Sequence, residues 1–202
     1  MPKPKRRLKN CSKKQGWSRF SPSLMHTPDS TTKTLEMLWG NYLALASQVD
    51  PATMVPDLLD EYRQRRMPTQ PMRLATWLAR QSFSLAAWSL WEQYSAFVCV
   101  NGHSERPKFK QSNHVLWVRD TMLSQGRTFR DWQWFNDARC IRNLVAHYAG
   151  RVSDIKSHAL LETGRIAFPE IDTYADGYLR LTHDHVAELQ VKIEEFVEDS
   201  KL

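Results

Sequence analysis

The chain of 202 residues contains few cysteines and glycines and no long uninterrupted apolar segment. Its three cysteines, Cys11, Cys99 and Cys140, are widely separated and odd in number, which fits neither a disulfide framework nor a zinc knuckle. We therefore interpret them as reduced thiols of a cytoplasmic protein. The most apolar stretch, residues 85–100, is interrupted by Glu92, so we expect no transmembrane span and no membrane partner.

Acidic residues are missing from the first 28 positions, and this makes the charge of the chain uneven. Eight of the 28 Lys and Arg residues precede Asp29, which leaves 20 basic and 22 acidic residues in the rest, so the net charge of +6 is a tail of +8 on a slightly acidic body. Residues 1–28 contain four prolines and lack the apolar core of a secretory signal. We expect this segment to be disordered when free and to bind a polyanion such as RNA. Its candidate RNA-binding residues are Lys5, Arg6, Arg7, Lys9, Lys13 and Lys14.

Apolar residues recur at helical spacing through most of residues 29–202, which predicts one mainly helical domain. The longest helix, residues 72–100, is apolar on two sides, so we expect it to be buried on more than one face. After Gly164 the pattern alternates, and residues 165–168 and 178–181 are expected to pair as a hairpin. Other helices are expected between residues 30 and 50, after Pro56, at 113–125, within 128–150, weakly at 154–161, and at 182–198.

Three functional side chains gather near the end of the helix expected within residues 128–150: Arg142, Asn143 and His147. Asn143 and His147 are four residues apart, so they share a helix face, and the long side chain of Arg142 reaches the same region. An imidazole transfers protons near neutral pH, whereas a guanidinium binds phosphate through two parallel N–H hydrogen bonds. Gly150 follows where a helix terminator belongs. The sequence therefore predicts phosphate chemistry at a helix C-terminus, where the helix dipole favours a protonated His.

The pattern Arg-Asn-x-x-Ala-His-x-x-Gly over residues 142–150 resembles the motif of the HEPN superfamily (higher eukaryotes and prokaryotes nucleotide-binding), in which four residues separate an Arg from a His. The resemblance implies an all-α fold over residues 29–202: a HEPN-like four- to five-helix bundle with a small β-hairpin near the C-terminus. Some members carry a Glu in an apolar helix before the motif, as Glu92 does here. Only residues 142–150 carry the resemblance specifically.

The resemblance also implies an activity, that of a metal-independent endoribonuclease without a cofactor. His147 would take the proton of the ribose 2′-OH or protonate the 5′ leaving oxygen, and Arg142 would stabilise charge on the phosphorane. Asn143 would orient His147 or the phosphate. The products would carry a 2′,3′-cyclic phosphate and a 5′-OH. Four further residues would support the site or bind RNA: Glu92, Tyr148, Arg139 and Arg151.

Partners follow from the same resemblance. Active members are usually homodimers, in which two motif helices meet and form one composite cleft. Many bacterial relatives are toxins or abortive-infection effectors against phage, which implies an antitoxin or regulatory protein as a further partner to test. Relatives paired with a nucleotidyltransferase often have Tyr two residues after the His. That position is Ala149 here, and Tyr148 follows His147 directly, which argues against that branch.

Two other interpretations of the motif are open. In the first, Arg142 pairs with a nearby acid such as Glu92, and Asn143 and His147 cap carbonyl groups, so the residues are purely structural. In the second, the chain is a catalytically inactive HEPN-like module that binds nucleic acid or a protein partner. If the site is active, Glu92 would hold Arg142 or Arg139 in place.

A second histidine pair surrounds Asp184, but we expect no metal there. His183 and His185 stand at the start of the last expected helix, where polar residues commonly cap the helix or contact solvent. No further Cys or His cluster completes a ligand set. The sequence therefore predicts neither a metal nor a cofactor.

Removal of residues 1–28 tests whether the basic tail contributes to RNA binding. The variant should bind RNA more weakly than the full chain, because each lost phosphate contact removes counterion release from the free energy of binding. The loss of affinity should be larger at about 50 mM salt than at about 200 mM salt. Equal affinities at the lower salt concentration, measured by fluorescence anisotropy, would contradict a role of the tail in RNA binding.

Overall fold

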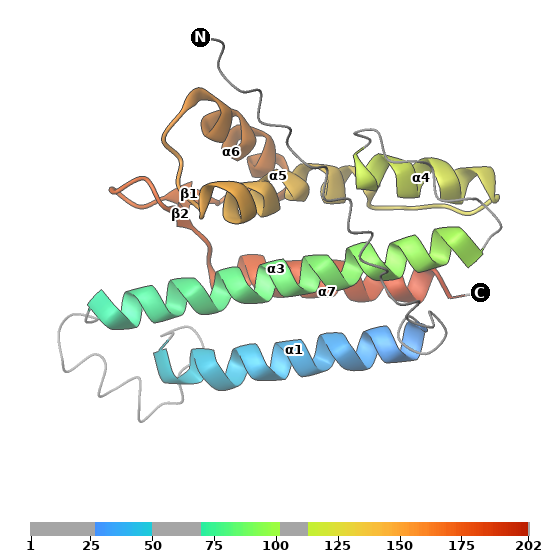
Figure 1. Ribbon diagram of the computed structural model, residues 1–202, viewed down its shortest axis with the longest axis horizontal. Coiled ribbons are helices and arrows are strands. Elements are labelled where there is room, and N and C mark those ends of the chain that lie inside the picture. The colour runs from blue at the N-terminus through green and yellow to red at the C-terminus, as the bar shows by residue number, and fades with distance from the viewer. Residues whose placement is uncertain (1–26, 50–69, 102–112, 202) are drawn as a thin grey trace, which may run out of the picture.

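The computed structural model describes residues 27–49, 70–101 and 113–201, and most of them lie in helices (Figure 1). The prediction of a mainly helical domain with a small C-terminal hairpin is confirmed for these residues. None of the helices in these ranges combines the length and the apolar character that crossing a bilayer requires. The elements are α1 (Pro28–Val49), α3 (Gln70–Asn101), α4 (His114–Ser124), α5 (Trp132–Tyr148), α6 (Ile155–Ala167), β1 (Asp172–Thr173), β2 (Leu179–Arg180) and α7 (His183–Asp199).

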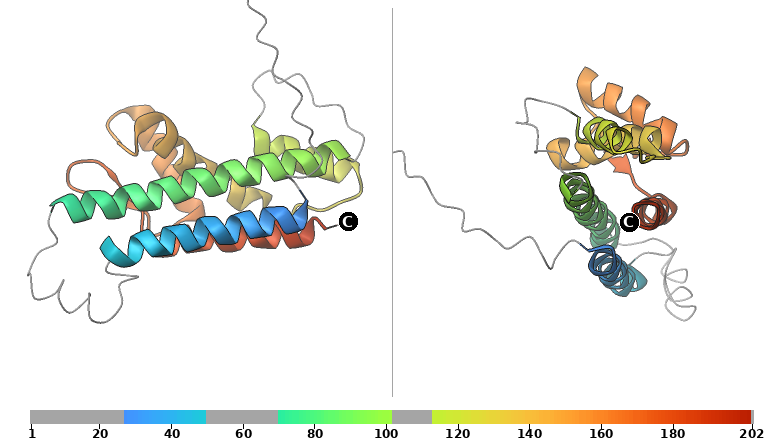
Figure 2. Two further views of the ribbon diagram at one scale, coloured as in Figure 1. Left: turned by 60° about the horizontal axis from the view of Figure 1, so that its bottom comes forward. Right: turned by 90° about the vertical axis from the view of Figure 1, so that its right-hand side faces the viewer.

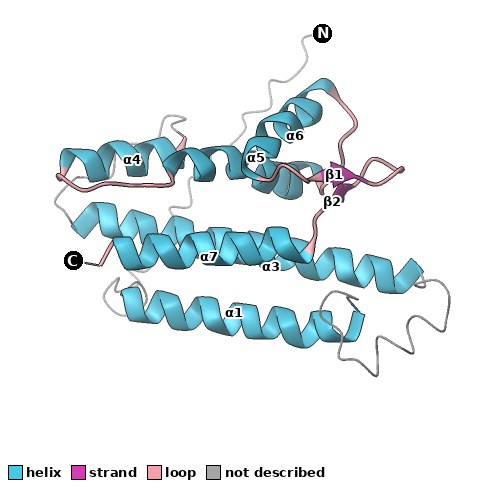
Figure 3. Cartoon of the chain, turned by 180° about the vertical axis from the view of Figure 1, so that it is seen from behind, coloured by secondary structure: helices cyan, strands magenta, loops and turns pink. Residues whose placement is uncertain are grey.

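Helix α3 is the central element. It contacts α1, α4, α5 and α7, which confirms the prediction that this helix is buried on more than one face. Seen end-on, α1, α3 and α7 pack together, and α4, α5 and α6 lie on the other side of α3 (Figure 2). Seen from behind, the hairpin lies beside α5 and α6, and the chain then enters α7 (Figure 3). The motif helix α5 is therefore held between α3 and α6.

An aromatic cluster joins α3, α5 and α7. Trp91 of α3 stacks on Phe135 of α5 with the ring centroids 4.6 Å apart, and both side chains are fully buried. Phe196 of α7 contacts Trp91 edge-on, and Phe129 contacts Phe196 in the same way. Burial of each such ring contributes about 1.5–3 kcal/mol. This cluster therefore fixes α5 against α3.

The end of α5 is formed by two residues with left-handed backbone, Ala149 with φ 48° and Gly150 with φ 70°. Their N–H groups both donate to the carbonyl oxygen of Leu144, which satisfies a group that the helix end would leave free. Position 150 favours glycine because side chains rarely adopt a φ of 70°, and a Cβ there would also come within 2.5 Å of the end of the Gln81 side chain. The Gly150 carbonyl accepts from the Leu179 N–H at 2.7 Å, and this bond docks the hairpin on α5.

The hairpin is shorter and later in the chain than predicted. Residues 165–167, which we expected in a strand, form the last turn of α6, so that prediction is wrong. The helix expected weakly at residues 154–161 continues to Ala167. The strands that do pair are β1 and β2, antiparallel, with Asp172 opposite Arg180 and Thr173 opposite Leu179.

Local interactions explain why α6 extends. Its start has a capping box, in which the Asp154 carboxylate accepts from the Ser157 N–H and the Ser157 hydroxyl accepts from the Asp154 N–H. Farther along, Gly164 lies directly against Ile141 of α5, and a Cβ at position 164 would collide with that side chain. The alternating sequence pattern is overridden because α6 buries its glycine face against α5.

Some predictions lie outside the described residues or at their edge. The short helix expected after Pro56 and the six candidate RNA-binding residues of the tail are outside them. At the edge, α1 begins at Pro28, so the last tail residue belongs to the helix. The Thr27 hydroxyl accepts from the Ser30 N–H at 3.2 Å and satisfies one free donor of the first turn.

The contact of Gly164 with Ile141 predicts an asymmetry between two glycine substitutions. Gly164→Ala should lower the free energy of unfolding by about 1–3 kcal/mol, because the added methyl group overpacks the α5–α6 contact. Gly40→Ala is the matched control, since Gly40 is also helical but, apart from its chain neighbours and the backbone of its own helix, no atom of the described residues lies within 4 Å of the place that a methyl group would occupy there. Alanine at this position should raise the free energy of unfolding by about 0.5–1 kcal/mol. Urea denaturation of both variants measures the difference, and equal effects would contradict close packing at Gly164.

Candidate functional site

Helix α5 turns a polar face outward in its second half. Ile141 and Leu144 are buried, whereas Arg142 and Asn143 are half-buried and His147 is exposed. The helix thus places the three predicted site residues near one another, with Asn143 and His147 one turn apart. This arrangement follows from helical periodicity, because the apolar residues between them face the core.

Arg142 is held by two neighbours. Its Nη2 lies 3.5 Å from Glu92 Oε2 of α3, and its Nη1 donates to Asn143 Oδ1 at 3.2 Å. The structure therefore brings Glu92 to Arg142, one of the two arginines that we expected it to hold. The side chains of Arg142 and Glu92 are 26% and 31% exposed, so water screens the pair only in part. The guanidinium is oriented but remains accessible from solvent.

Asn143 has a different partner from the one expected. Its side-chain oxygen accepts from Arg142, and no hydrogen bond between Asn143 and His147 occurs within the described ranges. Asn143 therefore contributes to the orientation of the guanidinium in this structure. The sequence did not predict this contact, because residues i and i+1 point in different directions along a helix and only the long side chain of Arg142 reaches back.

His147 lies in the last turn of α5 and is exposed. Tyr148 is half-buried against the hydrophobic core, while Arg151 is exposed and pairs through its backbone with Tyr178 of the hairpin region. The end of α5 therefore exposes one imidazole and one guanidinium close together in the chain.

Arg139 lies on the same face as Asn143, about one turn earlier. It is half-buried, and its Nε is buried without a hydrogen-bond partner in the part of the chain that the structure describes. Because this Nε is buried, an anion from solvent could reach Arg139 only through the rest of its guanidinium group.

A small cavity lies beside Arg142 between α3, α5 and α7, with a volume of about 20 Å³, or room for about one water molecule. His185 of α7 also lines it. The Thr182 N–H donates to His185 Nδ1 at 3.1 Å, and the Thr182 hydroxyl accepts from the His185 N–H at 3.3 Å. These bonds form a capping box at the start of α7. Burial lowers the pKa of His185, and Arg80 acts in the same direction, whereas Asp184 and Glu170 raise it.

The second histidine of that pair is also bonded to the fold, since His183 Nδ1 lies 3.0 Å from the Tyr42 hydroxyl. Within the described ranges, no three or more His, Cys, Asp or Glu residues gather in a way that could hold a metal ion. Cys99 and Cys140 are buried thiols that form no disulfide with any described residue, and burial raises the pKa of both. We therefore interpret these cysteines as packing residues.

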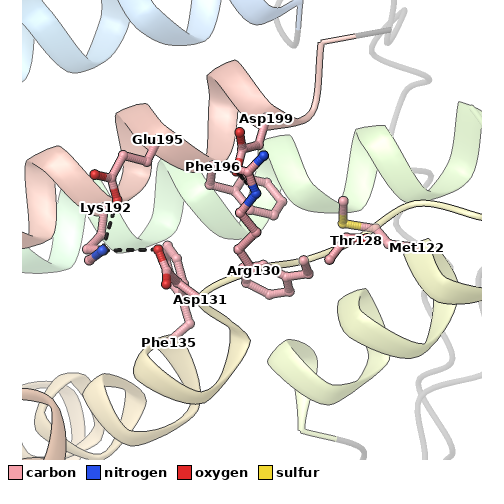
Figure 4. Close-up of a pocket in the computed structure, with 10 residues that line it drawn as sticks. Met122, Thr128, Arg130, Asp131, Phe135, Lys192, Glu195, Phe196 and Asp199 are labelled. Atoms are coloured by element: carbon pink, nitrogen blue, oxygen red, sulfur yellow. Dashed lines mark hydrogen bonds and ion pairs between the residues drawn. The ribbon is translucent and has the colours of Figure 1, made fainter.

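Another hollow lies between α7 and the start of α5 (Figure 4). Its volume is about 10 Å³, and its charged groups are paired within it. Lys192 Nζ lies 3.0 Å from Asp131 and 2.9 Å from Glu195, and Arg130 lies 3.5 Å from Asp199. These pairs leave little charge for a ligand, so the face of α5 that carries Arg142 is the better candidate site.

One contact of the site region was not predicted from the sequence. Trp88 donates its indole N–H to Glu92 Oε1 at 3.0 Å. The signal was the spacing of four residues, which places the indole and the carboxylate on one face of α3. His185 was expected to cap the last helix or to contact solvent, and it does cap α7, with an imidazole in place of the usual Glu or Gln of a capping box.

Comparison with known proteins does not assign the chain to a family. No family model matches the chain, and neither the curated proteins nor the solved structures contain a significant match.

The buried imidazole of His185, which caps the start of α7, predicts that the stability of the fold depends on pH. Because the pKa of His185 is lowered in the folded state, the unfolded chain binds a proton more readily than the folded chain below pH ~6.5. The free energy of unfolding should therefore fall as the pH falls through this range. His185→Gln keeps a cap acceptor but cannot be protonated, so its stability should depend less on pH. Urea denaturation at pH values on both sides of 6.5 measures this, and equal slopes in both proteins would contradict the assignment.

Proposed function

We propose that the chain is a metal-independent endoribonuclease with a HEPN-like helical fold. The observation that carries the proposal is the pair of contacts that hold Arg142, from Glu92 at 3.5 Å and to Asn143 at 3.2 Å, on the helix face that ends in the exposed His147. Arg142 is 26% exposed in this pair, so its guanidinium stays accessible to a ligand, and the same helix carries the exposed His147, whose imidazole can transfer protons at neutral pH.

Each residue then has a chemical role. His147 removes the proton of the ribose 2′-OH or protonates the 5′ leaving oxygen, and it needs no metal ion for either step. The 2′ oxygen attacks the adjacent phosphorus, and the bond from phosphorus to the 5′ oxygen breaks. Arg142 donates hydrogen bonds to the phosphorane oxygens as negative charge develops on them. The products are a 2′,3′-cyclic phosphate and a 5′-OH, and DNA is no substrate because it lacks the 2′-OH.

RNA binding extends beyond these residues. Arg139 is half-buried one turn before Asn143, and Arg151 is exposed after the end of α5. Both can contact phosphates next to the reacting one. The basic tail adds contacts that do not depend on sequence.

We also propose that the active form is a homodimer. The two cavities described above have volumes of about 10 and 20 Å³, so neither encloses a nucleotide. A second α5 face opposite the first would supply the missing wall and a second pair of Arg142 and His147. Such a nuclease would act in the cytoplasm as a toxin or anti-phage effector, with an antitoxin or regulatory protein as its partner.

The second candidate function is a catalytically inactive module that binds nucleic acid or a protein. One observation favours it: Glu92 already supplies Arg142 with a negative partner in the absence of RNA. In this alternative, the polar face of α5 binds but does not cleave.

Cleavage of RNA in EDTA separates the two functions. His147→Ala and Arg142→Ala should each lower kcat/KM by about 10²–10⁴-fold, the range typical of a lost general acid or base or charge-stabilising donor. His158→Ala is the matched control, because His158 is an exposed histidine on the neighbouring helix α6. It should cleave like the unchanged protein.

Two results would contradict the nuclease assignment. If His147→Ala cleaves as fast as His158→Ala, the assigned site is wrong. If the unchanged protein binds RNA without cleaving it, the binding module is the correct function. A protein that cleaves as a monomer would contradict the composite site alone.

A further inference from the structure

Two buried tryptophans of α3 differ in one respect. Trp88 and Trp91 are 1% and 0% exposed, and both contact Phe135 within the same aromatic cluster. The indole N–H of Trp88 donates to Glu92 at 3.0 Å. The indole N–H of Trp91 has no hydrogen-bond partner among the described residues. Core packing explains both rings, but it does not explain why one N–H points at the carboxylate beside Arg142.

Glu92 uses its two oxygens for different partners. Oε1 accepts from Trp88, and Oε2 faces Arg142 Nη2 at 3.5 Å. A carboxylate bonded at both oxygens cannot rotate about its last side-chain torsion without losing one contact. Trp88 is the rigid member of this series of contacts, which runs from Trp88 through Glu92 to Arg142. Its ring packs against Trp91 and Phe135, with centroid distances of 5.2 Å and 6.0 Å.

We propose that Trp88 is a positioning residue for Arg142, acting through Glu92. The indole N–H fixes the carboxylate, the carboxylate fixes one edge of the guanidinium, and Asn143 accepts from the Nη1 of the same group. This inference rests on the proposed nuclease function for its effect on rate, but the chain of contacts itself does not.

The physical need for such an anchor follows from the exposure of the ion pair. A partly exposed pair at 3.5 Å is weak, and an arginine side chain has many rotamers, so Glu92 alone orients Arg142 poorly. A catalytic guanidinium must meet charge that develops in the transition state, and an error of about 1 Å in its position lowers the rate strongly. A hydrogen bond from a locked indole removes the freedom of the intermediate carboxylate.

The sequence supplies a matched pair of variants for the test. Trp88→Phe removes a buried indole whose N–H is bonded to Glu92, and Trp91→Phe removes a buried indole whose N–H is not bonded in the described structure. Both lose similar volume from the same cluster. We expect Trp88→Phe to lower kcat by about tenfold, the effect of roughly one lost hydrogen bond to a charged group. Trp91→Phe keeps an aromatic ring against Phe135, so the register of α5 on α3 should persist and kcat should change by less than about twofold at a temperature where both variants remain folded.

Binding is the second readout of this experiment. The Kd for an RNA with methylated 2′ oxygens should change little in Trp88→Phe, because the charge of Arg142 is kept and only its orientation is lost. In the Glu92→Ala background, Trp88→Phe should have no further effect on kcat, since the side chain that transmits the effect is gone. Equal kcat values for Trp88→Phe and Trp91→Phe would reject the positioning role while leaving the nuclease function intact.

An NMR measurement tests the contacts even if the protein does not cleave RNA. The indole ¹H–¹⁵N signal of Trp88, assigned by its absence in Trp88→Phe, should shift in both Glu92→Gln and Arg142→Gln. The signal of Trp91 should shift less in each variant. Lack of RNA cleavage with these shifts would overturn the proposed function alone, whereas an unmoved Trp88 signal would overturn the positioning role.

Discussion

The stack of Trp91 on Phe135 is the contact on which the geometry of the site depends. It fixes α5 against α3, and Glu92 follows Trp91 directly in α3 while Arg142 lies two turns after Phe135 in α5. The aromatic contact therefore brings the carboxylate of one helix to the guanidinium of the other. The ion pair at 3.5 Å is too weak to set this register by itself. Apolar packing supplies the energy, and the polar contacts set the orientation.

Much of the fold follows from the sequence because its helices are long and strongly periodic. The end of α5 near Gly150 was predicted from a helix terminator, whose effect is local. The strand expected at residues 165–168 was wrong because its alternating pattern competes with packing of Gly164 on Ile141, which lies 23 positions away. A contact between distant residues leaves no local signal.

In the candidate site, too, some features were predicted from the sequence and others were not. The common face of Asn143 and His147 follows from helical spacing, and the approach of Glu92 to Arg142 was one of two expected pairings. A capping role at the start of α7 was among the expectations for His185, whereas the bond from Trp88 to Glu92 was not predicted, because a tryptophan in an apolar helix gives no sign of which polar group its N–H meets. The charge distribution adds a further point: the basic residues precede a body that is slightly acidic. Any anion binding by the body must therefore depend on a few arginines along α5 rather than on net charge.

A structure of the protein bound to a short RNA with methylated 2′ oxygens tests the central claim most directly. The account predicts a phosphate within hydrogen-bond distance of both Arg142 and His147, with Glu92 still in contact with Arg142. Contacts from a second α5 are expected on the opposite side of that phosphate. RNA bound elsewhere on the surface, with Arg142 paired only to Glu92 and Asn143, would contradict the assignment of this helix face as the active site.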